Sequence, residues 1–556
     1  MPLRLTRICA VLVAATLAAI AAAPAVSAPS TEGPPAGESP TATPIKHLVV
    51  IYQENASFDR YFGAYPVALN PPGEPPFHAR PGTPTVNGLT ETLRAHNPNA
   101  AQPFRFERRQ AFTCDMNHDY TSEQESYNGG LVDRFVEATE GKPFNPRQTC
   151  PQDEQGHYIA VMGHFDGNTV TALWHYAQHF AMSDNHFAAM FGESTRGALN
   201  LIAGDVYGVL CGPVGVVKAV GGPAAEGNVP ECGDPVDSTD TPAPTNGSLA
   251  TLVDDADPYW DICSTRESFV LPAIALSGRN VGDLLNEAGV TWGWFQEGFS
   301  LGPNGECYAA SSVLEAFDRV SGVDPATDTL TLQDYVPHHE PFQYFASTAN
   351  PGHLPPTATA VVGRQDQAHH QYDVEWFWRA AEAGNLPAVS FLKARQARDG
   401  HPGTSNSLDE QLWLVETLNR LQQLPEWESM AVVIAWDDSD GWYDHVMPPI
   451  VNHSATELDH GCGVETDGPP ARCGYGPRLP LLVISPWARE NYVSHALSDQ
   501  TSILRFIEDN WLGGRRVSDI SFDNFAGPLL DLFDFDRPRM RRLILDPDTG
   551  LIVSGP

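Results

Sequence analysis

Four short runs of apolar, often β-branched residues set the main constraint on the fold of this chain. Each run is bounded by polar residues, which is typical of strands buried on both faces of a sheet. The predicted strands are residues 45–52, 388–392, 431–436 and 481–485. Strand, helix and strand in sequence order indicate a mostly parallel sheet covered by helices, which is an α/β fold.

The helix of this pattern is predicted between the second and third strands. Residues 407–424 carry leucine and valine at helical spacing, so one face of the helix is apolar. Ser407 and Glu410 have the spacing of a capping box, which predicts that the helix begins there.

The chain begins with a predicted processing signal. Arg4 and Arg7 precede an apolar run over residues 8–23, and small residues follow at 25–28. Residues 1–28 are therefore expected to be a cleaved signal peptide. The alternative, a retained membrane anchor, is disfavoured because the run is shorter than the ~20 residues that a spanning helix needs.

The rest of the chain is predicted to be a linker followed by one large domain. Residues 29–44 are rich in Pro, Gly, Ser and Thr and are expected to be disordered. Residues 45–556 are expected to form the domain, with loop insertions near 67–85 and 210–260 where proline and glycine concentrate.

The net charge limits the partners of the protein. Asp and Glu number 69 against 33 Lys and Arg, which gives a formal charge of −36. Nucleic acid and anionic membrane surfaces would be repelled at long range. An anionic substrate therefore has to be received by a local positive centre, which histidines and a metal ion can supply.

The cysteines indicate an oxidising environment. Of nine cysteines, Cys9 lies in the predicted signal, which leaves an even number without any CxxC spacing. Disulfides are expected in an exported protein of this kind. The spacing does not fix the pairing, and the neighbouring pairs Cys211–Cys232 and Cys462–Cys473 are our expectation.

Polar side chains directly follow two of the predicted strands. Glu54 and Asn55 come after the first, and Asp437 and Asp438 come after the third. Ligands of open α/β sheets gather beyond the carboxyl ends of strands. The four side chains would suit a divalent cation as hard oxygen ligands. The alternative is ordinary capping and turn chemistry, in which Asp and Asn are common.

Ser194 is a candidate nucleophile. It lies in the segment FGESTRGALN, after an apolar stretch and at the start of a predicted helix. The helix dipole and the free N–H groups at that end favour an alkoxide or a bound phosphate. A plain N-cap serine is the alternative, and Thr195 competes for the same role.

Several histidines lie among polar residues instead of inside apolar runs. They are His118, His338, His339, His369, His370 and His401. An imidazolium can neutralise charge on a phosphoryl oxygen or protonate a leaving group. Any one of these histidines alone is more often structural, so their meaning depends on the other motifs.

Taken together, five segments resemble the bacterial phosphoesterase family that holds secreted acid phosphatases and the non-haemolytic type of phospholipase C. They are residues 45–63 (IKHLVVIYQENASFDRYFG), 114–124 (CDMNHDYTSEQ), 191–204 (FGESTRGALNLIAG), 334–342 (DYVPHHEPF) and 435–449 (AWDDSDGWYDHVMPP). A later segment, residues 476–489 (GPRLPLLVISPWAR), also fits the family.

The resemblance implies an alkaline-phosphatase-like α/β core, with helices on both faces of a mostly parallel sheet, one divalent metal ion and a covalent phosphoryl-enzyme step. The residues it implies are the metal ligands Glu54, Asn55, Asp437 and Asp438, the nucleophile Ser194, and the histidines around the phosphate, His118, His338, His339 and His401. His369 and His370 are interpreted as structural or peripheral. Oxygen ligands suggest calcium, magnesium or manganese, with zinc or iron as alternatives.

The chain departs from the family pattern at two places. Ala56 stands where arginine is common, and Glu193 and Arg196 stand where prolines are common. The first departure puts a supporting contact in doubt. The second is expected to change the shape of the nucleophile loop or to add a cation beside the phosphate.

The expected function is therefore a secreted or cell-envelope phosphoesterase that needs a metal and forms a phosphoserine. The form of the motif at 435–449, and a chain that ends soon after the last sheet motif, favour an acid phosphatase. A phospholipase C is the alternative within this class. A secreted protein that binds without catalysis is the alternative from another class. The expected partner is a phosphate ester, without nucleic acid and without a stable membrane anchor.

Overall fold

The computed structural model describes residues 40–143, 147–210, 249–252, 255–264, 273–307, 310–312, 331–452 and 473–555. The predicted signal peptide at 1–28, most of the linker at 29–44 and most of the insertion at 210–260 lie outside these residues. The linker ends in ordered structure, because the Thr43 N–H donates to Asn510 Oδ1 at 2.9 Å.

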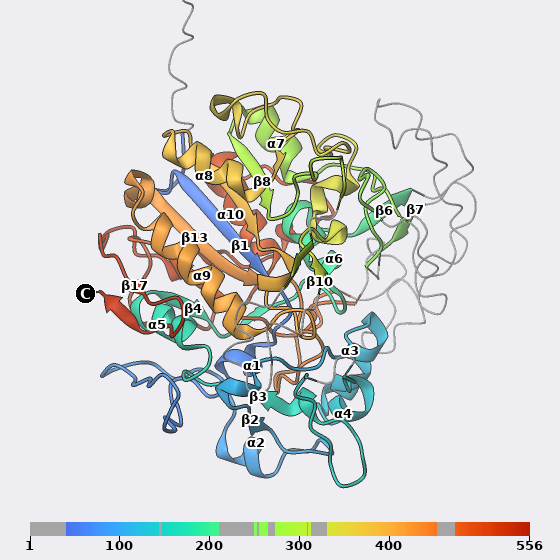
Figure 1. Cartoon of the computed structure of the whole chain (residues 1–556), viewed down its shortest axis with the longest axis vertical. Helices are drawn as coiled ribbons and strands as arrows, with labels where there is room; N and C mark the ends of the chain where they lie inside the picture. Colours follow the sequence, from blue (N-terminus) through green and yellow to red (C-terminus); the bar gives the residue numbers. More distant parts are fainter. Residues whose placement is uncertain are drawn as a thin grey trace, which may run out of the picture. The chain divides into compact units, whose positions relative to one another are not determined.

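Eight strands form one mainly parallel sheet in the order β11-β8-β12-β1-β13-β14-β4-β15 (Figure 1). The strands are β1 His47–Gln53, β4 Ala181–Ser183, β8 Trp292–Gln296, β11 Gln371–Tyr372, β12 Val389–Lys393, β13 Met430–Trp436, β14 Leu481–Ile484 and β15 Tyr492–Ser494. β1 runs parallel to β12 on one side and to β13 on the other. The four strands predicted from the sequence are confirmed, but β14 runs antiparallel to both neighbours.

Helices cover both faces of this sheet. The α-helices of the described residues are α1 Phe58–Phe62, α2 Glu91–Ala95, α3 Tyr120–Tyr127, α4 Phe135–Ala138, α5 Thr171–His179, α6 Ser194–Ala203, α7 Val281–Ala288, α8 Val374–Glu382, α9 Ser407–Leu421 and α10 Thr501–Trp511. In Figure 1, α1 to α4 lie below the sheet, beside β2 and β3. In the view of Figure 1, α8 and α9 lie in front of the sheet and α10 lies behind it. α6 packs against α10 on the far side. The mainly parallel α/β architecture expected from the sequence is thus confirmed.

Short strand pairs accompany the main sheet. They are β2 Phe104–Arg105 with β3 Gly163–His164, β5 His186–Phe187 with β16 Ser498–Asp499, β6 Tyr207–Leu210 with β7 Leu249–Thr251, β9 Ala310–Ser312 with β10 Thr331–Gln333, and β17 Ile544–Leu545 with β18 Ile552–Ser554. Residues 67–85 contain neither helix nor strand, and their being an insertion stays a prediction.

The central strands are buried along their whole length. Every residue of β13 is buried, and so is all of β1 except its first residue, His47. Because helices cover both faces, neither strand has a solvent side that would require polar residues. This explains the continuous apolar runs in the sequence, where a half-exposed strand would alternate.

The start of α9 differs from the prediction by one residue. Asn406 is the N-cap, and its side chain accepts hydrogen bonds from the N–H groups of residues 408 and 409. Ser407 is already helical, and its hydroxyl lacks a hydrogen-bond partner. Glu410 accepts from Trp436 Nε1 at 3.1 Å. The predicted capping box is therefore wrong, because a buried tryptophan holds the Glu410 side chain inward.

Two disulfides join neighbouring cysteines in the described part of the chain. They are Cys114–Cys150 and Cys263–Cys307. Cys473 is also disulfide-bonded. The expected pairs Cys211–Cys232 and Cys462–Cys473 involve residues outside the described ranges, so they stay predictions.

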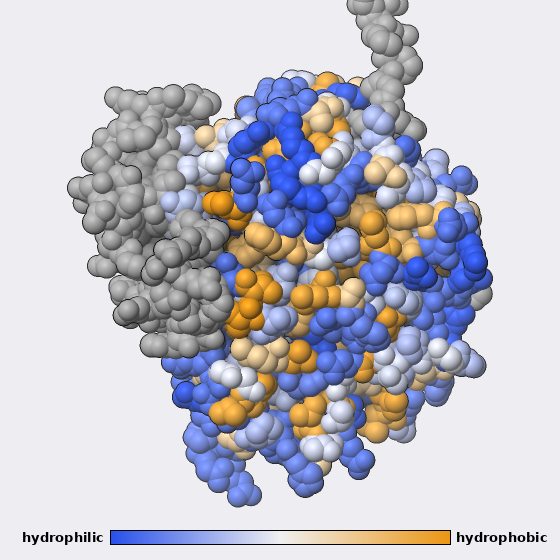
Figure 2. All heavy atoms as spheres, turned by 180° about the vertical axis from the view of Figure 1, so that it is seen from behind, coloured by the Kyte–Doolittle hydropathy of each residue, from blue (hydrophilic) through white to orange (hydrophobic). Residues whose placement is uncertain are grey.

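Hydrophilic and hydrophobic residues are intermixed on the face shown in Figure 2. Among the described residues, no helix combines the length and the apolar character needed to cross a membrane.

The cap of α9 gives a first test. Replacing Asn406 with alanine is expected to lower the free energy of unfolding by about 1 kcal/mol, because two helical N–H groups lose their acceptor. Ser407→Ala is the matched control and should change it by less than about 0.5 kcal/mol. Guanidinium denaturation followed by circular dichroism measures both. Equal destabilisation by the two variants would contradict this assignment of the cap.

Candidate active site

The carboxyl ends of β1 and β13 lie side by side, so the polar residues that follow them meet. In the parallel register Gln53 pairs with Trp436, the last residue of β13. Asn55 has a φ of 40°, a conformation that asparagine tolerates better than most residues. Its backbone N–H donates to Asp437 Oδ1 at 3.3 Å. The pairing of the two strands thus brings together residues that lie far apart in the sequence.

Helix α6 carries Ser194 to the same place. Ser194 is its first residue and Glu193 is its N-cap, so the plain N-cap alternative for Ser194 is wrong. At Gly197, one turn into the helix, a Cβ atom would lie 2.1 Å from the Asp437 carbonyl oxygen. Only glycine allows the helix to approach the end of β13 this closely.

Three acceptor oxygens surround the Ser194 hydroxyl. Ser194 Oγ lies 2.9 Å from Asp438 Oδ2, 3.2 Å from Glu54 Oε2 and 3.4 Å from Asn55 Oδ1. A hydroxyl has one proton, which it can donate to only one of them. Buried oxygens that face one another without a proton between them repel, and a cation would remove this repulsion. The donor set therefore fits the oxygen-ligated divalent cation expected from the sequence.

Asp437 lies beside this group, and both of its oxygens are engaged by other donors. Its Oδ1 accepts from the N–H groups of Asn55 and Asp438, at 3.3 and 2.9 Å. Its Oδ2 lies 3.3 Å from Lys393 Nζ. Asp437 is thus brought to the site as expected, and its role as a metal ligand stays a prediction.

Lys393 is a site residue that the sequence analysis missed. It is the last residue of β12, and its Nζ donates to Glu54 Oε1 and to Asp437 Oδ2. The side chain is 1% exposed. A signal was present in the sequence, because Lys393 directly follows the predicted strand 388–392, at the edge of the sheet where ligands gather.

Glu123 of α3 was also missed, although it lies in the segment 114–124 that carries the family resemblance. Its carboxylate accepts from the Gly192 N–H at 2.6 Å and from the Ser439 hydroxyl. It therefore ties the loop before Ser194 to the loop after Asp438. Burial raises the pKa of Glu123 to about 7, although its bond to Ser439 opposes the shift.

His338 and His339 lie next to each other but differ in charge. His339 Nδ1 is 3.1 Å from Glu54 Oε1, and burial, with the Lys393 charge, lowers its pKa well below the ordinary value. His338 lies 3.7 Å from Asp255 and 3.4 Å from Asp257. Burial alone would lower its pKa, but these carboxylates raise it to about 9. Near neutral pH, His338 is therefore charged and His339 neutral.

His118 and His401 form a second pair, with ring centroids 6.2 Å apart. One ligand atom from each of these rings and from Asp440 lies within 4.8 Å of the others. His118 Nδ1 lies 2.9 Å from the Met116 carbonyl, and His401 Nδ1 lies 2.6 Å from the Pro402 carbonyl. Carbonyl oxygens only accept, so both Nδ1 atoms carry hydrogen and both Nε2 atoms are available to a ligand.

The other histidine pair lies outside this site. The His370 ring stacks on Trp292 with centroids 4.3 Å apart, and its Nδ1 faces the Trp292 carbonyl at 2.9 Å. This packing supports the structural interpretation of His370. His369 is exposed.

One departure from the family pattern follows β1, and the other lies in the nucleophile loop. Ala56 is fully buried. Gly192 has a φ of 105°, and a Cβ atom there would lie 1.8 Å from Arg196 Nη2. The buried Arg196 guanidinium therefore packs directly on the backbone of the loop that leads to Ser194.

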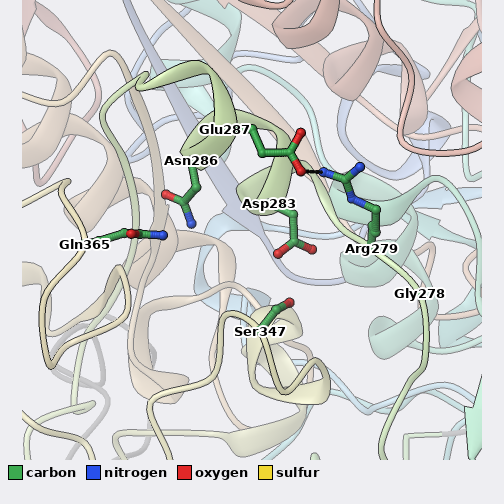
Figure 3. Close-up of a pocket in the computed structure, with 7 residues that line it drawn as sticks. All are labelled: Gly278, Arg279, Asp283, Asn286, Glu287, Ser347 and Gln365. Carbon is green, nitrogen blue, oxygen red and sulfur yellow. Dashed lines mark hydrogen bonds and ion pairs between the residues drawn. The ribbon is translucent and has the colours of Figure 1, made fainter.

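Two polar clusters elsewhere among the described residues do not offer comparable chemistry. A cavity of about 560 Å³ opens beside α7, where Arg279 pairs with Glu287 (Figure 3). Its lining contains none of the predicted site residues. Asp261, Cys263 and His353 also form a group with metal-ligand spacing. The Cys263 sulfur is not a thiolate ligand, however, because it is bonded to Cys307.

Fold and site together define the class of this protein: an α/β protein with a helix-terminal serine set among buried acids at the ends of parallel strands. Comparison with known sequences then gives the family. The chain belongs to the phosphoesterase family, whose sequence model matches residues 45–512. The family resemblance inferred from the motifs is thus confirmed.

Relatives of this chain are named phospholipases C. The non-hemolytic phospholipase C of Burkholderia pseudomallei is 25% identical over 490 residues, which are 84% of this chain and 55% of that protein. Phospholipase C B of Mycobacterium tuberculosis is 23% identical, over 89% of this chain and 79% of that protein. Non-specific phospholipase C3 of Arabidopsis thaliana is 21% identical, over 83% and 66%. The chain thus spans about half the length of the Burkholderia relative.

The oxygen cluster gives a second test. Adding Mn²⁺, Ca²⁺ or Zn²⁺ to EDTA-treated protein is expected to raise the melting temperature, because the folded site binds the ion and the unfolded chain does not. At an ion concentration ~100 times the dissociation constant, the stabilisation is about 2.7 kcal/mol. Asp438→Asn should remove most of the shift.

The matched control for that test is Asp536→Asn, which neutralises an exposed carboxylate and should leave the shift unchanged. Differential scanning fluorimetry measures all three proteins. An undiminished shift in Asp438→Asn would place the ion elsewhere.

Proposed function

We propose that this chain is a metal-dependent phosphoesterase that hydrolyses phosphate esters through a phosphoserine at Ser194. The observation that carries the proposal is the position of the Ser194 hydroxyl, at a helix amino end and within 3.4 Å of three predicted metal ligands. An alkaline-phosphatase-like arrangement of the core is part of the same proposal.

The residues of the site would each contribute to phosphoryl transfer. The Ser194 hydroxyl loses its proton to solvent as its Oγ attacks phosphorus, the ester P–O bond breaks, and the departing alcohol takes a proton from an imidazolium. Water then attacks the phosphoserine: its oxygen goes to phosphorus, one of its protons returns to the Ser194 oxygen, and the imidazole is reprotonated from solvent. A divalent cation held by Glu54 and Asp438 would lower the pKa of the hydroxyl and offset phosphate charge.

His338 is well placed to offset phosphate charge as well. Its imidazolium faces Asp255, and Asp255 Oδ1 accepts from the Thr195 N–H at 2.9 Å, at the amino end of α6. A phosphate bound at Ser194 would meet the helix dipole and this cation from neighbouring directions. His118, His339 and His401 are also proposed to surround the phosphate, with His339 as a neutral ring that can hydrogen-bond to it.

Two observations favour different ester substrates. The sequence form of residues 435–449 favours a phosphomonoester, as in an acid phosphatase. The names of the relatives favour a phosphodiester of the phospholipid type, as in a phospholipase C. Both substrates fit a serine attack on phosphorus, so the ester class is decided by experiment.

We also propose that the protein is secreted or held in the periplasm or cell envelope. The Cys114–Cys150 and Cys263–Cys307 disulfides are typical of exported proteins. The predicted signal at residues 1–28 lies outside the described residues and stays a prediction.

Replacing Ser194 with alanine tests the nucleophile. We expect kcat to fall at least about a thousandfold, because no other hydroxyl takes the place of Ser194 Oγ. The fold and the bound metal, followed by circular dichroism and elemental analysis, should be retained. Thr195→Ala is the neighbouring control and should keep most of the activity. The opposite ranking of the two variants would move the nucleophile to Thr195.

A substrate comparison tests the ester class. Hydrolysis of p-nitrophenyl phosphate is measured against release of phosphocholine from phosphatidylcholine, with the same metal-loaded preparation. A monoesterase is expected to be at least about tenfold faster on the first, and a phospholipase C on the second. Protein that binds metal or phosphate but turns over neither substrate would favour the non-catalytic alternative.

A further inference from the structure

Lys393 is a buried cation to which the proposed mechanism assigns no role. Its side chain is 1% exposed, and the carboxylates that it contacts, Glu54 and Asp437, are 0% and 1% exposed. A lysine so fully removed from water is costly unless it is paired. Here the pairing is with two of the four residues predicted to bind the metal.

In both carboxylates that Lys393 contacts, one oxygen faces the ammonium and the other has a different partner. Glu54 gives Oε1 to the Lys393 ammonium and Oε2 to the Ser194 hydroxyl. Asp437 gives Oδ2 to the ammonium, and its Oδ1 accepts backbone N–H groups. The ammonium therefore contacts Glu54 through a different oxygen from the one that faces Ser194. His339 and Asp399 complete the surroundings of Glu54.

We propose that Lys393 is a built-in counter-cation of the metal site, which offsets part of its negative charge and thereby weakens its binding of divalent ions. The inference rests on the proposed metal site but not on catalysis. Without the ammonium, Glu54 and Asp437 would be buried next to each other, and no other described cation would pair with either carboxylate in the absence of metal. Lys393 thus allows the protein to fold before the ion arrives.

This proposal and a purely structural role predict opposite changes in metal affinity when Lys393 is removed. If Lys393 only organised the carboxylates, removing it would loosen the ligands and weaken metal binding. If its charge matters, removal abolishes a repulsion between the ammonium and an ion that would share the Glu54 carboxylate with it. At the effective dielectric of protein sites, that repulsion is worth more than about tenfold in a binding constant.

The test uses four forms of the full-length protein, each stripped of metal with EDTA. They are the wild type, Lys393→Met, Lys393→Arg, and Lys46→Met as a control lysine that bonds Thr41 away from the site. Isothermal titration with Mn²⁺, Ca²⁺ and Zn²⁺ in turn gives the dissociation constants. Scanning fluorimetry gives the melting temperatures with and without ion.

We expect Lys393→Met to bind the ion at least about tenfold more tightly than the wild type. Its metal-free form should melt at least about 5 °C lower, and added ion should close most of that gap. Lys393→Arg, which keeps the charge, should stay within about threefold of the wild type. Lys46→Met should match the wild type in both measurements.

Unchanged or weaker ion binding by Lys393→Met would overturn the proposal. If that variant does not fold without metal, Lys393→Gln, which keeps hydrogen-bond donors but not the charge, replaces it with the same expectation of tighter binding. Absence of ion binding by the wild type would overturn the metal site and the role of Lys393 together. None of these measurements needs turnover, so an active Ser194→Ala variant would refute the proposed nucleophile without affecting this result.

Discussion

The parallel pairing of β1 with β13 is the interaction on which the rest of the site depends. It places the two strand ends level, so that Glu54 and Asn55 meet Asp437 and Asp438 although almost four hundred residues separate them. The hydrogen bonds of a parallel ladder fix the register of both strands, and a slip by one residue would turn these side chains to the opposite face. The polar cluster is therefore held by backbone geometry that is buried on both faces.

Electrostatic balance is the second condition that the fold has to satisfy. Acids gather at these strand ends, and burial raises the pKa of Asp438 to about 6, opposed by His118. Hydrogen bonds from Lys393, backbone N–H groups and hydroxyls offset part of the free-energy cost of burying these acids. Glu123 contributes differently, because it joins two loops of the site through their own hydrogen-bond donors. The overall charge of −36 therefore says little about the local field that a substrate would meet.

Much of the fold and part of the site could be predicted from the sequence. The strands were recognisable because burial on both faces makes their apolar runs continuous, and Ser194 and the acids directly follow elements that could be recognised. Strand pairing depends on residues far apart in the sequence, and no local pattern specifies it. The reversed direction of β14 and the contacts of Lys393 were therefore missed. The cap of α9 was misplaced because Asn406 and Ser407 are both good caps, and only tertiary contacts decide between them. Glu123 offered no local signal beyond its motif.

The lack of a side chain at Gly197 affects how constant the distance between α6 and the end of β13 is. Gly197 lets the main chain of α6 approach the Asp437 carbonyl directly, and a main-chain contact has no rotamers to exchange. Warming that makes neighbouring side chains hop between conformers would therefore leave this spacing nearly constant. The hydroxyl and the acids around it would stay in reach of each other until the sheet itself begins to open.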